Sequence, residues 1–243
     1  MERILAFFVL FAVMLFLQHW LQQHIQGFTF AVTGNPGCAV RALFLLLLPG
    51  VLLHELSHWV VANLLGVRTG RISIGLGKMR GKHFSLGSVT VERSDPLRES
   101  LIGLAPFISG LLAIWALMGF GFDLWTTTDP LLILETVWST IADPLTLLSL
   151  YLVFAVSTAM IPSASDREPW GFIIALFAAI GTLALVLGWT PNITPQLLQL
   201  ARQVLDALTL VFGVTVFVNG VLAVAIWVVE WSYGAMTQRR VRY

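Results

Sequence analysis

Long apolar stretches separated by short polar ones make up most of the chain, and their lengths indicate helices that cross a membrane. A helix needs ~20 apolar residues to cross the hydrocarbon layer. We expect membrane spans at about residues 4–20, 39–66, 97–121, 144–161, 170–189 and 195–231. The pattern therefore predicts an all-α polytopic membrane protein with about six transmembrane helices, forming a single integral membrane domain over residues 1–243.

A polar, glycine-rich stretch over about residues 67–95 interrupts the helical pattern after the second span. Apolar and polar residues alternate there with a period of two at 71–74, 84–86 and 88–92, which is typical of half-buried strands. We therefore expect a small β-hairpin-like insert. A second connection, over 122–142, predicts a short amphipathic helix at about 131–140.

The composition supports a membrane protein and excludes several other classes. Of the 243 residues, 57% are hydrophobic and 11% are charged, and the mean hydropathy is +0.85. In soluble proteins ~45–50% of the residues are apolar and ~25% are charged on average. A net charge of +1, with no basic tract outside the loops, argues against nucleic-acid binding. The single cysteine, Cys38, excludes an internal disulfide framework and a cysteine-rich zinc site.

The basic residues predict an orientation in the membrane. If the N-terminus is cytoplasmic, 12 of the 14 Lys and Arg residues fall on the cytoplasmic side of six spans, and Arg41 and Arg202 fall outside. Such a bias is the positive-inside pattern. We expect a multi-pass protein with both termini on the cytoplasmic side, in contact with the lipid bilayer.

Three polar side chains interrupt the second span in the sequence His54-Glu55-Leu56-Ser57-His58. Charged groups inside a membrane helix are costly and usually functional. His54 and His58 are four residues apart, so their imidazoles lie ~5–6 Å apart on one helix face and can bind one Zn²⁺. Glu55 lies beside them, where it can accept a proton from water. The alternative is that these side chains only form hydrogen bonds to neighbouring helices.

A catalytic zinc site usually has three protein ligands, so a third must come from elsewhere. Asp166 is preferred, because Pro162 breaks the fourth span and lets the chain turn a carboxylate inward. Glu168 is the second candidate, and a helix cap or a loop charge is the alternative role of Asp166. His24 is disfavoured because it is predicted on the outer side, and Glu230 is interpreted as a flank of the last helix.

Asn219 is a lone amide in the last helix. We expect it to form a hydrogen bond between helices, and contact with a substrate backbone is the alternative.

The chain resembles the site-2 protease family of intramembrane zinc metalloproteases over about residues 45–170. The likeness rests on the segments Pro49–His58, Gly103–Leu112 and Ile161–Asp166, together with the β-rich insert. It implies His54, His58 and Asp166 as zinc ligands and Glu55 as general base. It also implies that the insert meets an unwound substrate.

Four details depart from the family pattern. Ala105 precedes Pro106 where glycine is usual, and Ser109-Gly110 stands a few residues later where asparagine is usual. Arg167 follows Asp166 in place of glycine, and no asparagine precedes Pro162 at the expected place. Metal binding is therefore better supported by the sequence than catalytic turnover.

The leading hypothesis is a zinc-dependent intramembrane endopeptidase that hydrolyses a peptide bond in or near a transmembrane segment of a membrane protein. The alternative is a catalytically inactive protease-like membrane subunit with a structural, assembly or regulatory role. A transporter is less favoured, because the sequence has no repeat symmetry and no paired broken helices.

Overall fold

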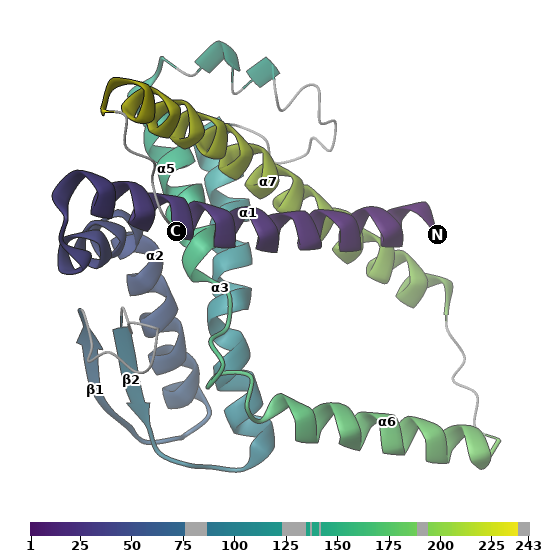
Figure 1. The fold of residues 1–243 in the computed structure, drawn as a ribbon. Helices are drawn as coiled ribbons and strands as arrows, with labels where there is room; N and C mark the ends of the chain where they lie inside the picture. The colour runs from purple at the N-terminus through teal and green to yellow at the C-terminus, as the bar shows by residue number, and fades with distance from the viewer. Residues whose placement is uncertain (76–86, 123–134, 137, 141, 189–193, 238–243) are drawn as a thin grey trace.

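Long helices make up most of the part of the chain that the computed structural model describes, which is residues 1–75, 87–122, 135–136, 138–140, 142–188 and 194–237. Figure 1 shows their arrangement. In chain order the elements are α1 (Glu2–Thr33), α2 (Pro36–Leu64), β1 (Thr69–Ile74), β2 (Gly87–Val91), α3 (Pro96–Phe122), α5 (Pro144–Ala159), α6 (Trp170–Val186) and α7 (Pro195–Thr237).

Four of these helices, α1, α2, α3 and α7, are long and apolar enough to cross a membrane. This confirms the prediction of a helical, membrane-embedded protein. Helices α5 and α6 are also apolar, but they have 16 and 17 residues. At ~1.5 Å per residue they are ~24–26 Å long, short of the ~30 Å hydrocarbon layer. The number of spans that helix length supports is therefore below the six expected.

Local sequence signals set where several helices begin. Asn35 caps α2 by accepting a hydrogen bond from the Gly37 backbone N–H at 2.8 Å, and Pro36 follows at the first helical position. Asp143 caps α5 in the same way and is followed by Pro144. A capping oxygen satisfies an N–H that the helix cannot, and proline has no N–H to leave unsatisfied.

The insert after α2 contains the predicted strands. β1 and β2 pair antiparallel, with Ile72 opposite Val89 and Ile74 opposite Gly87. Both strands contact α2. The predicted strand at 84–86 and half of the predicted amphipathic helix at 131–140 lie outside the described residues, and residues 135–136 and 138–140 are helical.

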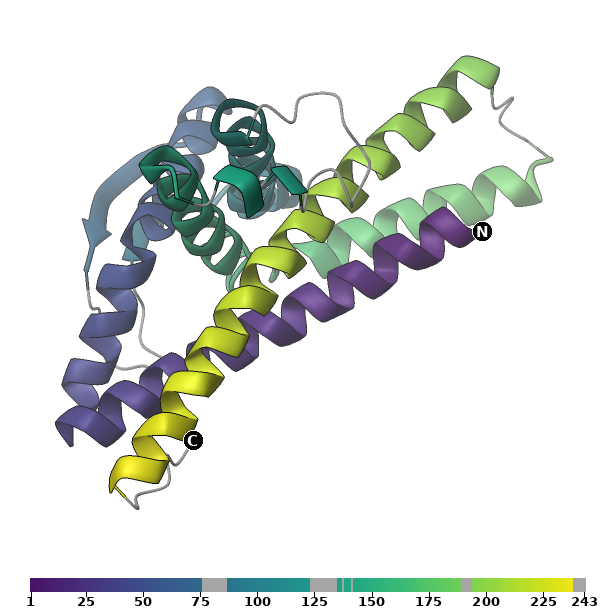
Figure 2. The same ribbon diagram turned by 90° about the horizontal axis from the view of Figure 1, so that it is seen from above.

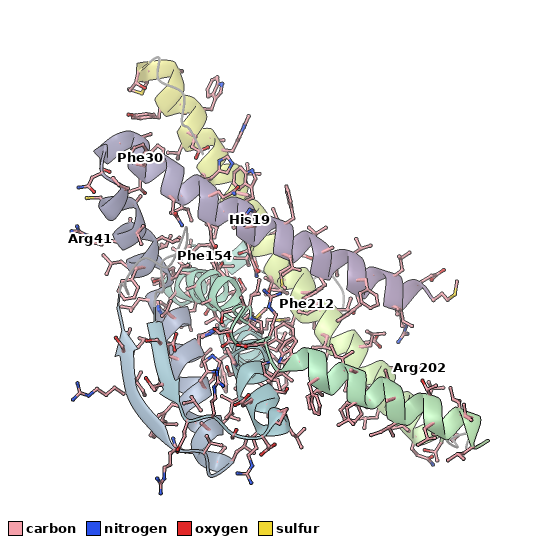
Figure 3. The ribbon with its side chains drawn as sticks, turned by 60° about the horizontal axis from the view of Figure 1, so that its bottom comes forward. His19, Phe30, Arg41, Phe154, Arg202 and Phe212 are labelled. Atoms are coloured by element: carbon pink, nitrogen blue, oxygen red, sulfur yellow. The ribbon has the colours of Figure 1, made fainter. Side chains whose placement is uncertain are left out.

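The core lies where α2, α3 and α5 pack together and where α1 and α7 cover them (Figure 1). The ring of Phe212 on α7 contacts Phe7 and Phe11 of α1 and Phe107 of α3, and Figure 3 shows it where these elements cross. Helix α6 extends away from this core and has no buried residue.

Helices α1 and α7 lie side by side and run in the same direction (Figures 1 and 2). Arg3 in the first turn of α1 pairs with Asp206 in the first third of α7, and Tyr233 near the end of α7 donates a hydrogen bond to the Ala31 carbonyl near the end of α1. In the predicted six-span arrangement the first and last helices cross in opposite directions. The structure differs from that arrangement, because it pairs Arg3 with Asp206, only four residues after Arg202, which was expected on the opposite side from Arg3.

The two basic residues expected on the outer side are also well separated. Arg41 lies near the start of α2 and Arg202 near the start of α7, at opposite ends of the molecule in Figure 3. The orientation predicted from the basic residues depends on every apolar stretch crossing the membrane in alternating directions, and the structure does not support that number of spans.

Candidate metal centre

Two histidines on one face of α2 bring their Nε2 atoms to within 3.2 Å of each other. On the opposite side of each ring, Nδ1 is hydrogen-bonded to a backbone carbonyl from another helix. His54 Nδ1 lies 2.7 Å from the Ala159 oxygen at the end of α5, and His58 Nδ1 lies 2.8 Å from the Ile102 oxygen in α3. The two rings are therefore held by three helices.

Both carbonyls are available because a helix is interrupted nearby. The Ile102 oxygen would accept from residue 106 in a regular helix, but residue 106 is proline and has no N–H. The Ala159 oxygen would accept from Ser163, but the Ser163 N–H donates to Asp166 Oδ2 instead, at 2.6 Å. Two broken helical hydrogen bonds thus supply the acceptors that orient the histidines.

These contacts fix the tautomer of each neutral ring. A carbonyl oxygen can only accept a hydrogen bond, so Nδ1 carries the proton in both His54 and His58. In a neutral imidazole, Nε2 then has a lone pair. Two lone pairs 3.2 Å apart repel each other unless a cation lies between them. A histidine that donates through one nitrogen and binds metal through the other is the usual arrangement in protein metal sites.

Asp166 completes the cluster from the turn between α5 and α6. Its Oδ1 lies 3.5 Å from His58 Nε2 and its Oδ2 lies 3.7 Å from His54 Nε2. Ser163 shapes this turn, because its hydroxyl accepts from the Asp166 N–H at 3.3 Å while its own N–H donates to the Asp166 carboxylate. The reciprocal pair resembles a capping box.

The Asp166 carboxyl is ionised at neutral pH. Burial acts to raise its pKa, but interactions with His54 and Ser163, together with the nearby His58, outweigh burial and lower the pKa from 3.8 to about 2. The group is therefore in the form that can bind a cation.

The spacing of the three side chains fits a small divalent cation. One ligand atom from each of His54, His58 and Asp166 can be chosen so that all three lie within 4.8 Å of one another. Two nitrogen ligands at ~2.0–2.1 Å from a tetrahedral Zn²⁺ lie roughly 3.3 Å apart. The observed 3.2 Å between the imidazoles matches this value. The distances of 3.5 and 3.7 Å to the carboxylate are too long for good hydrogen bonds.

Glu55 lies next to this cluster and is only 7% exposed. Its carboxylate is close enough to interact electrostatically with His54 and Asp166. The first residue of β2, Gly87, packs directly against it, since a Cβ at Gly87 would lie 2.6 Å from Glu55 Oε1. Strand β2 of the insert therefore begins beside the predicted general base.

The other predicted candidates lie elsewhere. Glu168 is exposed. Glu230 is buried, but its Oε2 contacts His24 Nδ1 at 2.8 Å between α7 and α1. Among the described residues, neither belongs to a group of three side chains that could hold a metal ion.

Three glycines that the sequence analysis did not assign to the site let its elements approach closely. A Cβ at Gly50 of α2 would overlap the Ala155 carbonyl of α5, and one at Gly103 of α3 would overlap the Asp166 carbonyl. A Cβ at Gly110 of α3 would collide with Met160. Glycine within a helix is unfavourable on its own, so its occurrence at these positions could have indicated that another element packs closely against the helix there.

The carbonyls of Ile102 and Ala159, and the hydroxyl of Ser163, were also missed. Pro106 could have indicated Ile102, because a proline always leaves the carbonyl four residues earlier without its helical partner. No sequence signal indicates Ala159, whose role depends on how α5 packs against α2.

Comparisons with protein-family models, with curated proteins and with solved structures find no match to this chain.

Proposed function

We propose that the chain is a membrane-embedded zinc-dependent endopeptidase in which His54, His58 and Asp166 hold Zn²⁺ and Glu55 is the general base. The substrate would be a peptide bond in or near a transmembrane segment of another membrane protein. The resemblance to the site-2 protease family supports this class of reaction.

One observation carries the proposal. When both rings are neutral, the two Nε2 atoms that face each other at 3.2 Å are acceptors, and the Asp166 carboxylate oxygens lie 3.5 and 3.7 Å from them. Polar side chains that only join helices are expected to pair donors with acceptors, and three facing acceptors do the opposite. A divalent cation satisfies all three.

A bound Zn²⁺ would supply Lewis acidity, which polarises the scissile carbonyl and makes a water molecule easier to deprotonate near neutral pH. Glu55 accepts the proton of the attacking water and returns it to the leaving amine. The buried position of Glu55, with Gly87 against it, limits access of bulk water to this proton transfer. The contact with Gly87 also supports the insert as part of the substrate site.

The charge pattern supports a cytoplasmic location for the insert and for the adjacent end of α2. Half of the 14 basic residues fall in or beside the insert. They are Arg68, Arg71, Lys78, Arg80, Lys82, Arg93 and Arg98. Helix α2 ends at Leu64, six residues after His58, so the proposed metal site lies ~9 Å from that end of the helix.

The alternative, an inactive protease-like subunit, is favoured by Ala105 and Arg167, where the family pattern has glycine. The enzyme and the inactive subunit differ in whether they need the carboxylate of Glu55. An enzyme needs a carboxylate there for proton transfer, whereas an assembly subunit needs only the fold and the metal.

The experiment compares the parent protein with Glu55→Gln, with Glu92→Gln on the exposed part of the insert as the matched control. Each protein is purified and its zinc content is measured. Each is also co-expressed with a panel of single-span membrane proteins, and cleavage of these substrates is detected by mass spectrometry. We expect about one zinc per chain in all three, cleavage by the parent and by Glu92→Gln, and none by Glu55→Gln. Metal without cleavage in the parent would support the inactive subunit, and a parent without bound metal would overturn both.

A further inference from the structure

Buried amides and hydroxyls gather where α1, α5 and α7 meet, away from the cluster of His54, His58 and Asp166. Gln18 of α1 is 1% exposed, and Ser157 of α5 and Asn219 of α7 are fully buried. Such side chains inside an apolar helix bundle cost free energy unless they form hydrogen bonds. Their partners therefore indicate what they do.

All the contacts converge on Ser157. Gln18 Nε2 donates to the Ser157 backbone oxygen at 2.8 Å. Asn219 Nδ2 lies 3.5 Å from the Ser157 hydroxyl oxygen, the outer limit of a hydrogen bond, and this is the interhelical contact expected for this asparagine. The Ser157 hydroxyl itself donates to the Phe154 carbonyl at 3.1 Å. Helices α1 and α7 thus both hold the last turn of α5.

This last turn also orients a proposed metal ligand. The final carbonyls of a helix lack partners within the helix, and at the end of α5 they are used for contacts with other helices. The Ser157 oxygen accepts from Gln18, and two residues later the Ala159 oxygen accepts from His54 Nδ1 at 2.7 Å. The chain then continues from Ala159 to Asp166, so a displacement of this helix end moves both a carbonyl that orients His54 and the segment that carries the carboxylate.

We infer that Gln18, assisted by Asn219, is a positioning residue for the proposed metal site: it holds the end of α5 and thereby sets the orientation of His54. The inference rests on the proposed function for the identity of the bound group. Neither Gln18 nor Asn219 contacts the metal ligands, and their effect passes through Ser157 and the Ala159 carbonyl.

A substitution that keeps the size of Gln18 and removes its N–H tests this inference. Gln18→Met is compared with Gln23→Met, the same change five residues further along α1 at an exposed side chain whose Nε2 contacts His19. Zinc affinity is measured by competition with a chelator, and the ligand field is measured from the visible absorption of the Co²⁺-loaded protein. Groups that orient metal ligands typically contribute 10–100-fold in affinity.

We expect Gln18→Met to weaken zinc binding by about tenfold and to shift the Co²⁺ absorption bands, and Gln23→Met to change neither. We expect Asn219→Leu to weaken zinc binding and to shift the Co²⁺ bands by a smaller amount than Gln18→Met, because the contact of Asn219 with Ser157 is longer than that of Gln18. It carries the test if Gln18→Met does not fold. Unchanged affinity and unchanged bands in a folded Gln18→Met would overturn the inference while leaving the proposed metal site in place.

A readout without metal separates the two proposals. In protein labelled with ¹⁵N-histidine, the Nδ1–H resonance of His54 is assigned by its loss in His54→Asn. We expect Gln18→Met to shift it and to speed its exchange with solvent, and Gln23→Met to leave it unchanged. If the parent binds no metal, the proposed function fails and this resonance still decides whether Gln18 positions His54. An unchanged resonance would overturn the inference.

Discussion

His24 and Glu230 form a buried histidine–carboxylate contact between α1 and α7, while His54, His58 and Asp166 form another between α2 and the turn after α5. In the first, His24 Nδ1 lies 2.8 Å from Glu230 Oε2, and the Trp20 ring stacks on the imidazole at 3.6 Å between centroids. In the second, the nearest carboxylate oxygens lie 3.5 and 3.7 Å from the imidazole nitrogens. Histidine and carboxylate are thus in direct hydrogen-bond contact between α1 and α7, whereas between α2 and the turn after α5 they are too far apart for a good hydrogen bond.

The difference comes from which ring nitrogen is used and what the other one contacts. His24 meets the carboxylate directly through Nδ1. His54 and His58 donate their Nδ1–H groups to the carbonyls of Ala159 and Ile102, which leaves both Nε2 atoms facing Asp166. A direct hydrogen bond joins two helices, whereas a group of acceptors at this spacing can hold a cation. Residue composition alone does not separate these two roles.

Removing one imidazole from each group gives the largest expected contrast. His58→Ala should lower the zinc content from about one per chain to none, because two protein ligands do not make a stable site. His24→Ala should leave the zinc content unchanged. Metal analysis of the purified proteins measures both. Zinc retained in His58→Ala, or lost in His24→Ala, would contradict the assignment of the metal site to His54, His58 and Asp166 and not to His24 and Glu230.

The carboxylate should contribute less than an imidazole but still measurably. Asp166→Asn removes the negative charge and keeps the shape of the side chain, so we expect zinc affinity to fall at least tenfold, by the loss of an ionised ligand. Glu168→Gln, two residues away and exposed, should have no effect. Chelator competition compares the two. A larger loss in Glu168→Gln would show that the third ligand is assigned to the wrong residue.

A smaller effect is expected at the close contact between α2 and α5. Gly50→Ala would overlap the Ala155 carbonyl, and overpacking of this kind costs ~1–3 kcal/mol of the free energy of unfolding. Gly181→Ala on α6 has open space around it and should be neutral or stabilising by up to ~1 kcal/mol. Unfolding in detergent measures both variants. Equal stabilities would mean that α2 and α5 are further apart than described.

The smallest effect is expected from the pair of His24 and Glu230. Glu230→Gln keeps a hydrogen-bond acceptor for His24 but removes the charge, and side-chain hydrogen bonds in membrane proteins contribute ~0.6 kcal/mol on average. We expect a loss of about 1 kcal/mol or less in the free energy of unfolding, with zinc content unchanged. A loss of zinc in this variant would mean that the two histidine–carboxylate groups are coupled.

The sequence predicted those parts of the molecule that depend on local patterns. Apolar length predicted the long helices, alternation predicted β1 and β2, and the spacing of His54 and His58 placed both on one face of α2. Asp166 was selected because Pro162 ends its helix, and the structure places its carboxylate beside the two imidazoles. Whether these residues bind zinc and whether the chain is an enzyme stay predictions.

What the sequence did not predict depends on packing between distant segments. The parallel contact of α1 with α7, with Arg3 beside Asp206, follows from how the helices fit together and not from their hydropathy. Glu230 was interpreted as a flank because its partner, His24, is about 200 residues away in the chain, and no local pattern links the two. The carbonyl of Ala159 could not be assigned for the same reason.

X-ray absorption at the zinc edge, on the purified protein loaded with one equivalent of Zn²⁺, tests the central claim most directly. We predict four ligands at ~2.0–2.1 Å, with the multiple-scattering pattern of two imidazoles and the remainder from oxygen. A spectrum with sulfur scattering, or one without imidazole scattering, would contradict the assignment of His54, His58 and Asp166 as the metal site.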